Sequence, residues 1–175
     1  MLREIVSLFV VTAPTLSADS IEVFDGILLR LIGKVDEAAL IELSASLASL
    51  PSAPPKVVNQ LARHRAIAVA GPLLRNSALI SEETLGEAVK SKVPALIDAV
   101  ASRSEIPEAV TDLLVELGDS ELARKVARHP GARIGVRGFV RLIKRAETEP
   151  ALAAEIAQRP DVPDELRAFL RVPAA

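Results

Sequence analysis

Residues 96–126, LIDAVASRSEIPEAVTDLLVELGDSELARKV, contain one complete copy of a pattern that the chain repeats. Pairs of apolar residues four positions apart occur here three times in succession, at Leu96/Val100, Val110/Leu114 and Leu122/Val126. This spacing places both members of a pair on one face of an α-helix. Proline, glycine and acidic residues separate the pairs, so each copy contains two short helices joined by turns.

Four copies occur between Ala70 and Leu170. The pairs of the first helix are Ala70/Leu74, Leu96/Val100, Leu122/Val126 and Leu152/Ile156, and those of the second are Leu85/Val89, Val110/Leu114, Val136/Val140 and Leu166/Leu170. A two-helix unit that recurs at this period is typical of helical-repeat proteins. The sequence therefore predicts an all-α fold, an α-solenoid of stacked helical hairpins resembling a HEAT or armadillo superhelix, with about a dozen helices. No stretch alternates with the period of two that a strand requires.

We predict a single domain over residues 1–175, because domains commonly contain ~100–200 residues. Residues 1–50 form N-terminal capping helices in this prediction, with Ser17 and Asp36 as helix N-caps. The proline-rich segment 51–55 forms a corner, and residues 55–172 contain the helical repeats, of which the last is a short cap. Further helices are expected to have Ser81 and Asp119 as N-caps, or to contain a proline in the first turn, namely Pro94, Pro107, Pro150 and Pro163.

The composition excludes several kinds of chemistry. The chain has no cysteine, which removes disulfides, zinc ribbons, iron–sulfur ligation and a thiol nucleophile. It has four Phe and no Trp or Tyr, whereas small-molecule pockets usually have an aromatic lining. No long apolar stretch or signal peptide is present. We therefore expect a cytoplasmic protein without cofactor, metal, enzymatic activity or membrane partner.

The charge distribution points to one segment. Residues 124–145 contain eight Lys and Arg and no Asp or Glu, although the whole chain has a net charge of −2. Three interpretations remain open: an ion-paired or solvated face, a site for an acidic protein, and a site for duplex nucleic acid. The candidate partner-binding residues are Arg124, Arg128, Arg133, Arg137, Arg141, Lys144 and Arg145. For the ion-paired alternative, the partners would be Glu108, Asp112 and Glu116 of the preceding copy.

The helix expected over residues 134–145 carries most of these cations. Its predicted core face consists of Val136, Phe139, Val140 and Ile143, with Leu142 left over for a dimer contact or for packing on the next repeat. Gly135 and Gly138 also lie in this segment, where each glycine costs ~1 kcal/mol relative to alanine. Close approach of a neighbouring helix and a frayed helix start explain the two glycines equally well.

Other polar residues have simpler explanations than catalysis. His64 and His129, the only histidines, follow helical segments, where a histidine complements the helix dipole. Adjacent carboxylates such as Glu82 and Glu83 lie in first helical turns, where capping explains them. Neither arrangement matches the opposed carboxylates of a glycosidase or the ligand spacing of a zinc site.

Several short motifs occur in a fixed order along the chain. They are LLRLI at 28–32, APPKVV at 53–58, AGPLL at 70–74 with Ser77 and Leu79, ASR at 101–103, IPEAVT at 106–111, LVELGD at 114–119, HPGAR at 129–133 and RPDVP at 159–163. Together these motifs resemble the bacterial family of unknown function DUF2336. The resemblance implies HEAT-like or leucine-rich-variant-like helical repeats and carries no catalytic residues. One departure is His129, where members of the family commonly have asparagine before the proline.

The expected function is that of a non-enzymatic protein-interaction scaffold or adaptor, in bacterial signalling or regulation, which binds an acidic partner through the basic segment 124–145. The alternative is duplex nucleic-acid binding by the same segment, with an affinity that falls steeply with salt. An enzyme built on helical repeats is a third class, and a polar cleft would favour it. The oligomeric state is left open.

Overall fold

The computed structural model describes residues 2–170, which form twelve α-helices and one short 3-10 helix. The prediction of an all-α chain with about a dozen helices is confirmed for this part of the chain. The elements are α1 (Leu2–Thr12), η1 (Ala13–Thr15), α2 (Ala18–Ile32), α3 (Glu37–Leu47), α4 (Pro55–Ala62), α5 (Ile67–Asn76), α6 (Glu82–Lys90), α7 (Pro94–Ala101), α8 (Glu108–Leu117), α9 (Ser120–Arg128), α10 (Val136–Ala146), α11 (Pro150–Ala157) and α12 (Asp164–Arg167).

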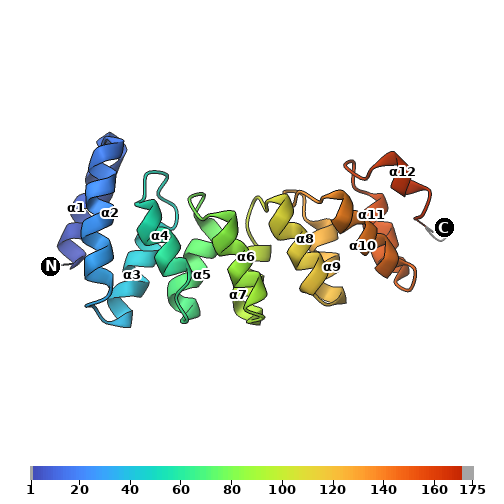
Figure 1. Ribbon diagram of the computed structural model, residues 1–175, viewed down its shortest axis with the longest axis horizontal. Coiled ribbons are helices and arrows are strands. Elements are labelled where there is room, and N and C mark those ends of the chain that lie inside the picture. Colours follow the sequence, from blue (N-terminus) through green and yellow to red (C-terminus); the bar gives the residue numbers. More distant parts are fainter. Residues whose placement is uncertain (1, 171–175) are drawn as a thin grey trace.

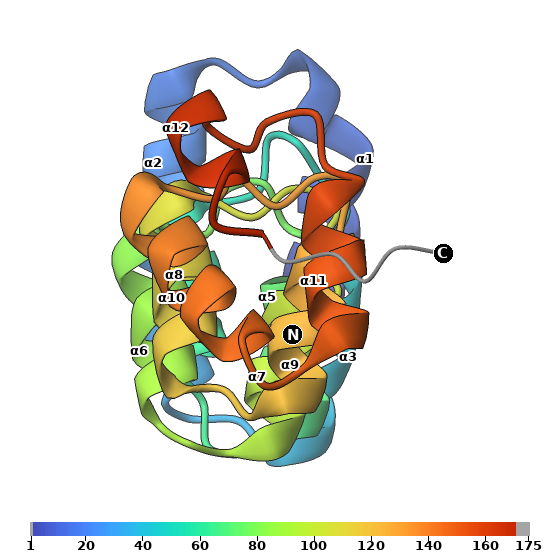
Figure 2. The same cartoon turned by 90° about the vertical axis from the view of Figure 1, so that its right-hand side faces the viewer.

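The helices lie in two rows along the long axis of the molecule (Figure 1). The first row consists of α1, α3, α5, α7, α9 and α11, and each of these helices contacts the next in the row. The second row contains α2, α4, α6, α8 and α10 (Figure 2). Each helix of the second row from α4 to α10 also packs against the helix that follows it in sequence, so the chain zigzags between the rows.

The core lies between the two rows and runs along their length. Leu74, Val100 and Val126 of the first row are fully or almost fully buried, and so are Leu85 and Leu114 of the second. Leucine, valine, isoleucine and alanine make up nearly all of this core, as the scarcity of aromatic residues requires. The apolar pairs in the sequence thus mark the inner faces of α5 to α9.

Most predicted helix starts are correct. The side chains of Ser17, Asp36, Ser81 and Asp119 accept hydrogen bonds from the first turns of α2, α3, α6 and α9. Pro94 and Pro150 are the first residues of α7 and α11. Pro107 and Pro163 lie one position earlier than predicted, as the N-cap residues of α8 and α12.

Several helices of the second row are capped by a side chain of the preceding helix in that row. Asp25 of α2 is buried and accepts hydrogen bonds from the amides of Lys56 (3.0 Å) and Val57 (2.8 Å) at the start of α4. Helix α4 needs this cap because its N-cap residue is Pro54, whose side chain cannot accept a hydrogen bond. Asn59 of α4 accepts a bond from the amide of Ser81, the N-cap of α6 (2.9 Å). These bonds join the N-terminal end of each helix to the middle of the preceding helix in the row.

Two arginines make the corresponding connection in the first row, at the other end of its helices. Arg103 follows α7 and donates to the carbonyls of Leu74 (2.6 Å) and Ser77 (2.9 Å) at the end of α5. Burial lowers the pKa of Arg103 from its ordinary value. Arg159 follows α11 and donates to the carbonyls of Ala127 (3.2 Å) in the last turn of α9 and of His129 (2.8 Å) and Ala132 (2.8 Å) after it. Both side chains satisfy carbonyls that a helix end leaves unpaired.

The predicted core face of α10 is wrong in part. Val136 and Val140 are 64% and 49% exposed, whereas Leu142 is fully buried beside Phe139 and Ile143. The cause lies in the turn before the helix. In the preceding copy the buried Ile106 comes two residues before the start of α8, but the equivalent Ala132 comes four residues before the start of α10. The two extra residues shift the helical register, so an alignment by sequence period selects the wrong positions.

The turns that precede α8 and α10 contact each other. The amide of Ile106 donates to the carbonyl of Gly131 (3.0 Å), and the amide of Arg133 donates to the carbonyl of Ile106 (3.1 Å), which forms an isolated parallel bridge. A side chain at Gly131 would overlap the carbonyl of Ser104, so only glycine allows this approach. The described residues contain no strand longer than this bridge.

Candidate functional site

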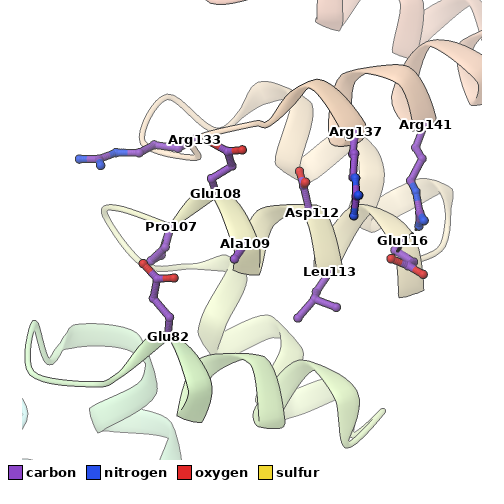
Figure 3. A pocket seen from close by; sticks show the side chains of 10 residues that line it. All are labelled: Glu82, Pro107, Glu108, Ala109, Asp112, Leu113, Glu116, Arg133, Arg137 and Arg141. Atoms are coloured by element: carbon purple, nitrogen blue, oxygen red, sulfur yellow. Dashed lines mark ion pairs between the residues drawn. The ribbon is translucent and has the colours of Figure 1, made fainter.

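A groove of about 690 Å³ lies between α8 and α10 and is bordered by the start of α6. Its lining is mostly charged, with carboxylates from α6 and α8 opposite arginines from α10 and the turn before it (Figure 3). The lining residues are Glu82, Pro107, Glu108, Ala109, Asp112, Leu113, Glu116, Arg133, Arg137 and Arg141. The groove thus brings together the basic segment and the acidic flank of the preceding copy.

The register of α10 fixes the direction of its cations. Gly138, Phe139, Leu142, Ile143 and Ala146 are buried and form the inner face. At about 100° per residue, the opposite side of the helix presents a mixed stripe of apolar and basic side chains. We call this stripe the α10 face, and it consists of Val136, Arg137, Val140, Arg141 and Lys144.

The carboxylates of α8 lie against the N-terminus of α10. The amide of Gly135 donates to Oδ1 of Asp112 (3.3 Å), and α10 has no side-chain cap of its own. A Cβ at Gly138 would lie 2.5 Å from that same oxygen, and one at Gly135 would overlap the carboxylate of Glu108. Both glycines therefore make room for a carboxylate, which a helix N-terminus attracts.

Both explanations of the glycines are thus partly correct. Close approach of α8 accounts for Gly138, which lies inside the helix. The helix starts at Val136, two residues later than predicted, so Gly135 is its N-cap residue and Arg133 lies in the preceding turn.

Three of the predicted cations interact with the α8 repeat. Arg141 pairs with Glu116 at 2.9 Å, as the ion-paired alternative expects, and Arg133 lies 3.9 Å from Glu105. Arg145 donates to the carbonyls of Gly118 (2.8 Å) and Asp119 (3.1 Å) after the end of α8.

Arg124 and Arg128 lie in the other row of helices. Nη2 of Arg124 is 2.8 Å from Oε1 of Glu155 on α11, and Nε of Arg128 is 3.7 Å from the same oxygen. The hydrogen bond with Glu155, together with its negative charge, raises the pKa of Arg124 above its ordinary value. The seven predicted residues therefore do not form one continuous surface, because α9 and α10 direct their arginines to different rows.

Arg137 and Lys144 differ from the other five cations. Neither makes an ion pair or side-chain hydrogen bond with any residue in the described part of the chain. Arg137 extends from α10 toward α8, between Asp112 and Glu116 in the view of Figure 3. The neighbouring Val136 and Val140 are exposed. Sequence analysis missed these valines as surface residues, and the longer turn before α10 was the only feature of the sequence that could have revealed them.

Each of the two histidine side chains accepts a hydrogen bond from an amide of the turn in which it lies. Nδ1 of His64 accepts a hydrogen bond from the amide of Ala66 (3.1 Å), and Nδ1 of His129 accepts one from the amide of Gly131 (3.1 Å). Over residues 2–170, no group of three or more His, Asp or Glu side chains is arranged to hold a metal ion. None of the helices described has the length and apolar character needed to cross a membrane.

Comparison with known proteins identifies a family for most of the chain. No curated protein and no solved structure matches the sequence. A family profile described as "Uncharacterised protein conserved in bacteria (DUF2336)" matches residues 69–172, which include most of α5, all of α6 to α12 and the whole groove. Because the match covers more than half of the chain, the protein belongs to the DUF2336 family.

Proposed function

We propose that this chain is a non-enzymatic scaffold of the α-solenoid, HEAT-like type, which binds an acidic protein segment on the α10 face. Three features support the assignment to solenoids: the two rows of paired helices, the core that runs between them, and hydrogen bonds exchanged by neighbouring pairs. Repeats that contact only their neighbours leave long surfaces on which other proteins bind.

The assignment of the binding face rests on one observation. Arg137 and Lys144 have no carboxylate partner in the described part of the chain, and they lie beside two exposed valines. Elsewhere in the molecule, some exposed cations such as Arg63 and Lys125 have acidic partners, at 2.6 Å in each case, and others such as Arg30 have none among the described residues. The α10 face is distinguished by two such cations beside two exposed valines and a charged groove. A segment with apolar and acidic side chains would cover the valines and supply the missing carboxylates.

The ion pairs already present on this face do not prevent binding. Arg141 and Glu116 are both about half exposed, and an exposed pair stabilises a protein by ~0–1 kcal/mol. A carboxylate of the partner could therefore replace Glu116 at small cost. The position of α10 near the end of the second row also favours this binding face. The last helix, α12, has only four residues, and Val136 and Val140 of α10 remain exposed.

Duplex nucleic acid fits this face less well. Phosphate binding requires several cations on one surface, whereas Arg124 and Arg128 pair with Glu155 in the other row. Glu82, Glu108 and Asp112 line the groove next to Arg137 and would repel phosphates. A protein segment can instead place its carboxylates beside Arg137 and Lys144 only.

The experiment compares capture of proteins from the host cell by the wild type and by Arg137→Glu/Lys144→Glu. The control is Lys90→Glu/Lys92→Glu, which makes the same change of net charge at exposed residues outside the α10 face. We expect a protein that the wild type and control retain and the test variant loses. Calorimetry with that purified protein should show at least tenfold weaker binding to the test variant, a loss of ~1.4 kcal/mol.

Two results would refute the proposal. One is the same set of captured proteins for all three baits. The other is salt-sensitive binding of generic duplex DNA or RNA that Arg137→Glu/Lys144→Glu abolishes, measured by fluorescence anisotropy at ~50 and ~200 mM salt. That second result would establish the nucleic-acid alternative.

A further inference from the structure

Helix α2 lies at the N-terminal end of the molecule (Figure 1). It has an apolar face that stays exposed in the described part of the chain. Val23 and Ile27, four residues apart, are 62% and 42% exposed. The opposite side of α2 carries the buried Asp25 and Leu28, and Asp25 bonds to the start of α4. Val23 and Ile27 therefore point away from the two rows of helices.

A glycine lies within this face. Gly26 is in the middle of α2, and a Cβ built on it would meet no atom within 4 Å. Glycine inside a helix is unfavourable relative to alanine, and no contact among the described residues requires it here. A glycine on an exposed helix face permits the close approach of a second helix.

Opposite charges lie at the two ends of the same face. Asp19 is in the first turn of α2 and Arg30 in the last, and neither has a partner among the described residues. Their positions suit the helix dipole, which accounts for the signs of the two charges. The dipole does not account for the exposed Val23, Gly26 and Ile27 between them.

We propose that the α2 face, defined as Asp19, Val23, Gly26, Ile27 and Arg30, binds the same face of a second copy of this chain. In a twofold dimer the two helices run antiparallel, and each residue contacts the position related to it by the symmetry. Asp19 and Arg30 are equally far from a point between Phe24 and Asp25. A twofold axis at that point places Asp19 opposite Arg30 of the partner subunit.

The same axis also pairs the central residues of the face. Val23 comes opposite Gly26 of the partner subunit. Because Gly26 has no side chain, the valine side chain fits into the space above it. Both ion pairs and both valine contacts form at once, because the symmetry makes each contact twice. A uniformly acidic or basic partner would match only one end of the face, whereas a second copy matches both.

The interface of this dimer is small. Only the five residues of the α2 face contribute to it from each protomer, so we expect a weak dimer with a dissociation constant on the order of micromolar. Phe9 of α1 packs against Phe24 and joins α1 to α2. The α2 face and the α10 face are at opposite ends of the chain, so this proposal does not depend on the proposed function.

Sedimentation velocity of the full chain over a range of concentrations tests the dimer by exchange of charges. We expect a wild-type dimer that Asp19→Arg or Arg30→Asp weakens by about tenfold or more, because each single change opposes like charges twice in the dimer. The double variant Asp19→Arg/Arg30→Asp should restore association, because it reverses both ion pairs. A wild-type chain that stays monomeric at every concentration would overturn the proposal.

Two further variants separate the dimer from the folding of α2. Gly26→Gln should keep or raise the melting temperature, because glutamine favours a helix, and should weaken the dimer by filling the space for Val23 of the partner subunit. Ile27→Glu should also weaken it, whereas Ile67→Glu should not, although Ile27 and Ile67 are equally exposed at 42%. A dimer that all of these variants form as strongly as the wild type would also overturn the proposal.

Discussion

Replacement of Arg159 by alanine should destabilise the C-terminal repeats more than any other single loss of charge in the molecule. The Arg159 side chain is 9% exposed and donates to three carbonyls between Ala127 and Ala132. It also pairs with Asp161 at 2.7 Å. At about 1 kcal/mol net for each carbonyl bond, the variant should lose ~3 kcal/mol of unfolding free energy. The ion pair with the exposed Asp161 adds little to this value.

Thermal and urea unfolding followed by circular dichroism would measure this loss. For a chain of this size, ~3 kcal/mol corresponds to a fall in Tm of about 10 °C. The Tm of Arg159→Lys should lie between those of the wild type and Arg159→Ala. Lysine keeps the charge but lacks the planar guanidinium group that reaches several carbonyls. Arg167→Ala is the matched control, since Arg167 is 41% exposed and its longer hydrogen bonds should contribute less than ~1 kcal/mol.

Hydrogen exchange would locate the effect. Arg159 holds the turn that leads from α9 to α10, so Arg159→Ala should increase exchange in residues 127–135 as well as in α11. A loss below ~1 kcal/mol, or a loss with unchanged exchange in that turn, would refute the view that Arg159 secures the end of the preceding repeat.

Other variants test the remaining connections, each by chemical unfolding. Asp112→Ala should cost ~1 kcal/mol, because it removes the acceptor for the amide that starts α10; no loss would contradict this. Gly131→Ala should cost ~2 kcal/mol or more through overlap with the carbonyl of Ser104, whereas Gly26→Ala, in open space, should gain ~0.5–1 kcal/mol. Asn59→Ala should lose ~2 kcal/mol through its four hydrogen bonds, and an unchanged midpoint would refute that role.

The sequence was sufficient to predict the helices from α5 to α9. In these copies the distance from the apolar pairs to the helix starts is nearly constant, and residues such as Ser81 and Asp119 mark the starts. The prediction failed at α10, where two additional residues in one turn moved the helix relative to the period. Periodicity determines which residues share a face only when the turns have equal lengths.

The candidate site could be predicted only in part. The excess of cations in residues 124–145 is evident in the sequence, and the pairing of Arg141 with Glu116 was one of its alternatives. The division of these cations between two rows depends on α11, whose Glu155 lies about 30 residues from Arg124. The α2 face was also missed, because spacing shows which residues of a helix share a face but not whether another helix covers a second apolar face.

The hydrogen bonds between neighbouring repeats restrict how such a chain can change in length during evolution. Asp25, Asn59 and Asp112 supply acceptors to the next helix of their row, while Arg103 and Arg159 supply donors to the previous helix of theirs. Deletion of one helical pair would bring together two repeats that are not neighbours now. One of them could then lack the side chain that bonds to the helix end of the other. Viable insertions and deletions should therefore concentrate in turns such as 132–135, where two residues were accommodated without loss of either connection.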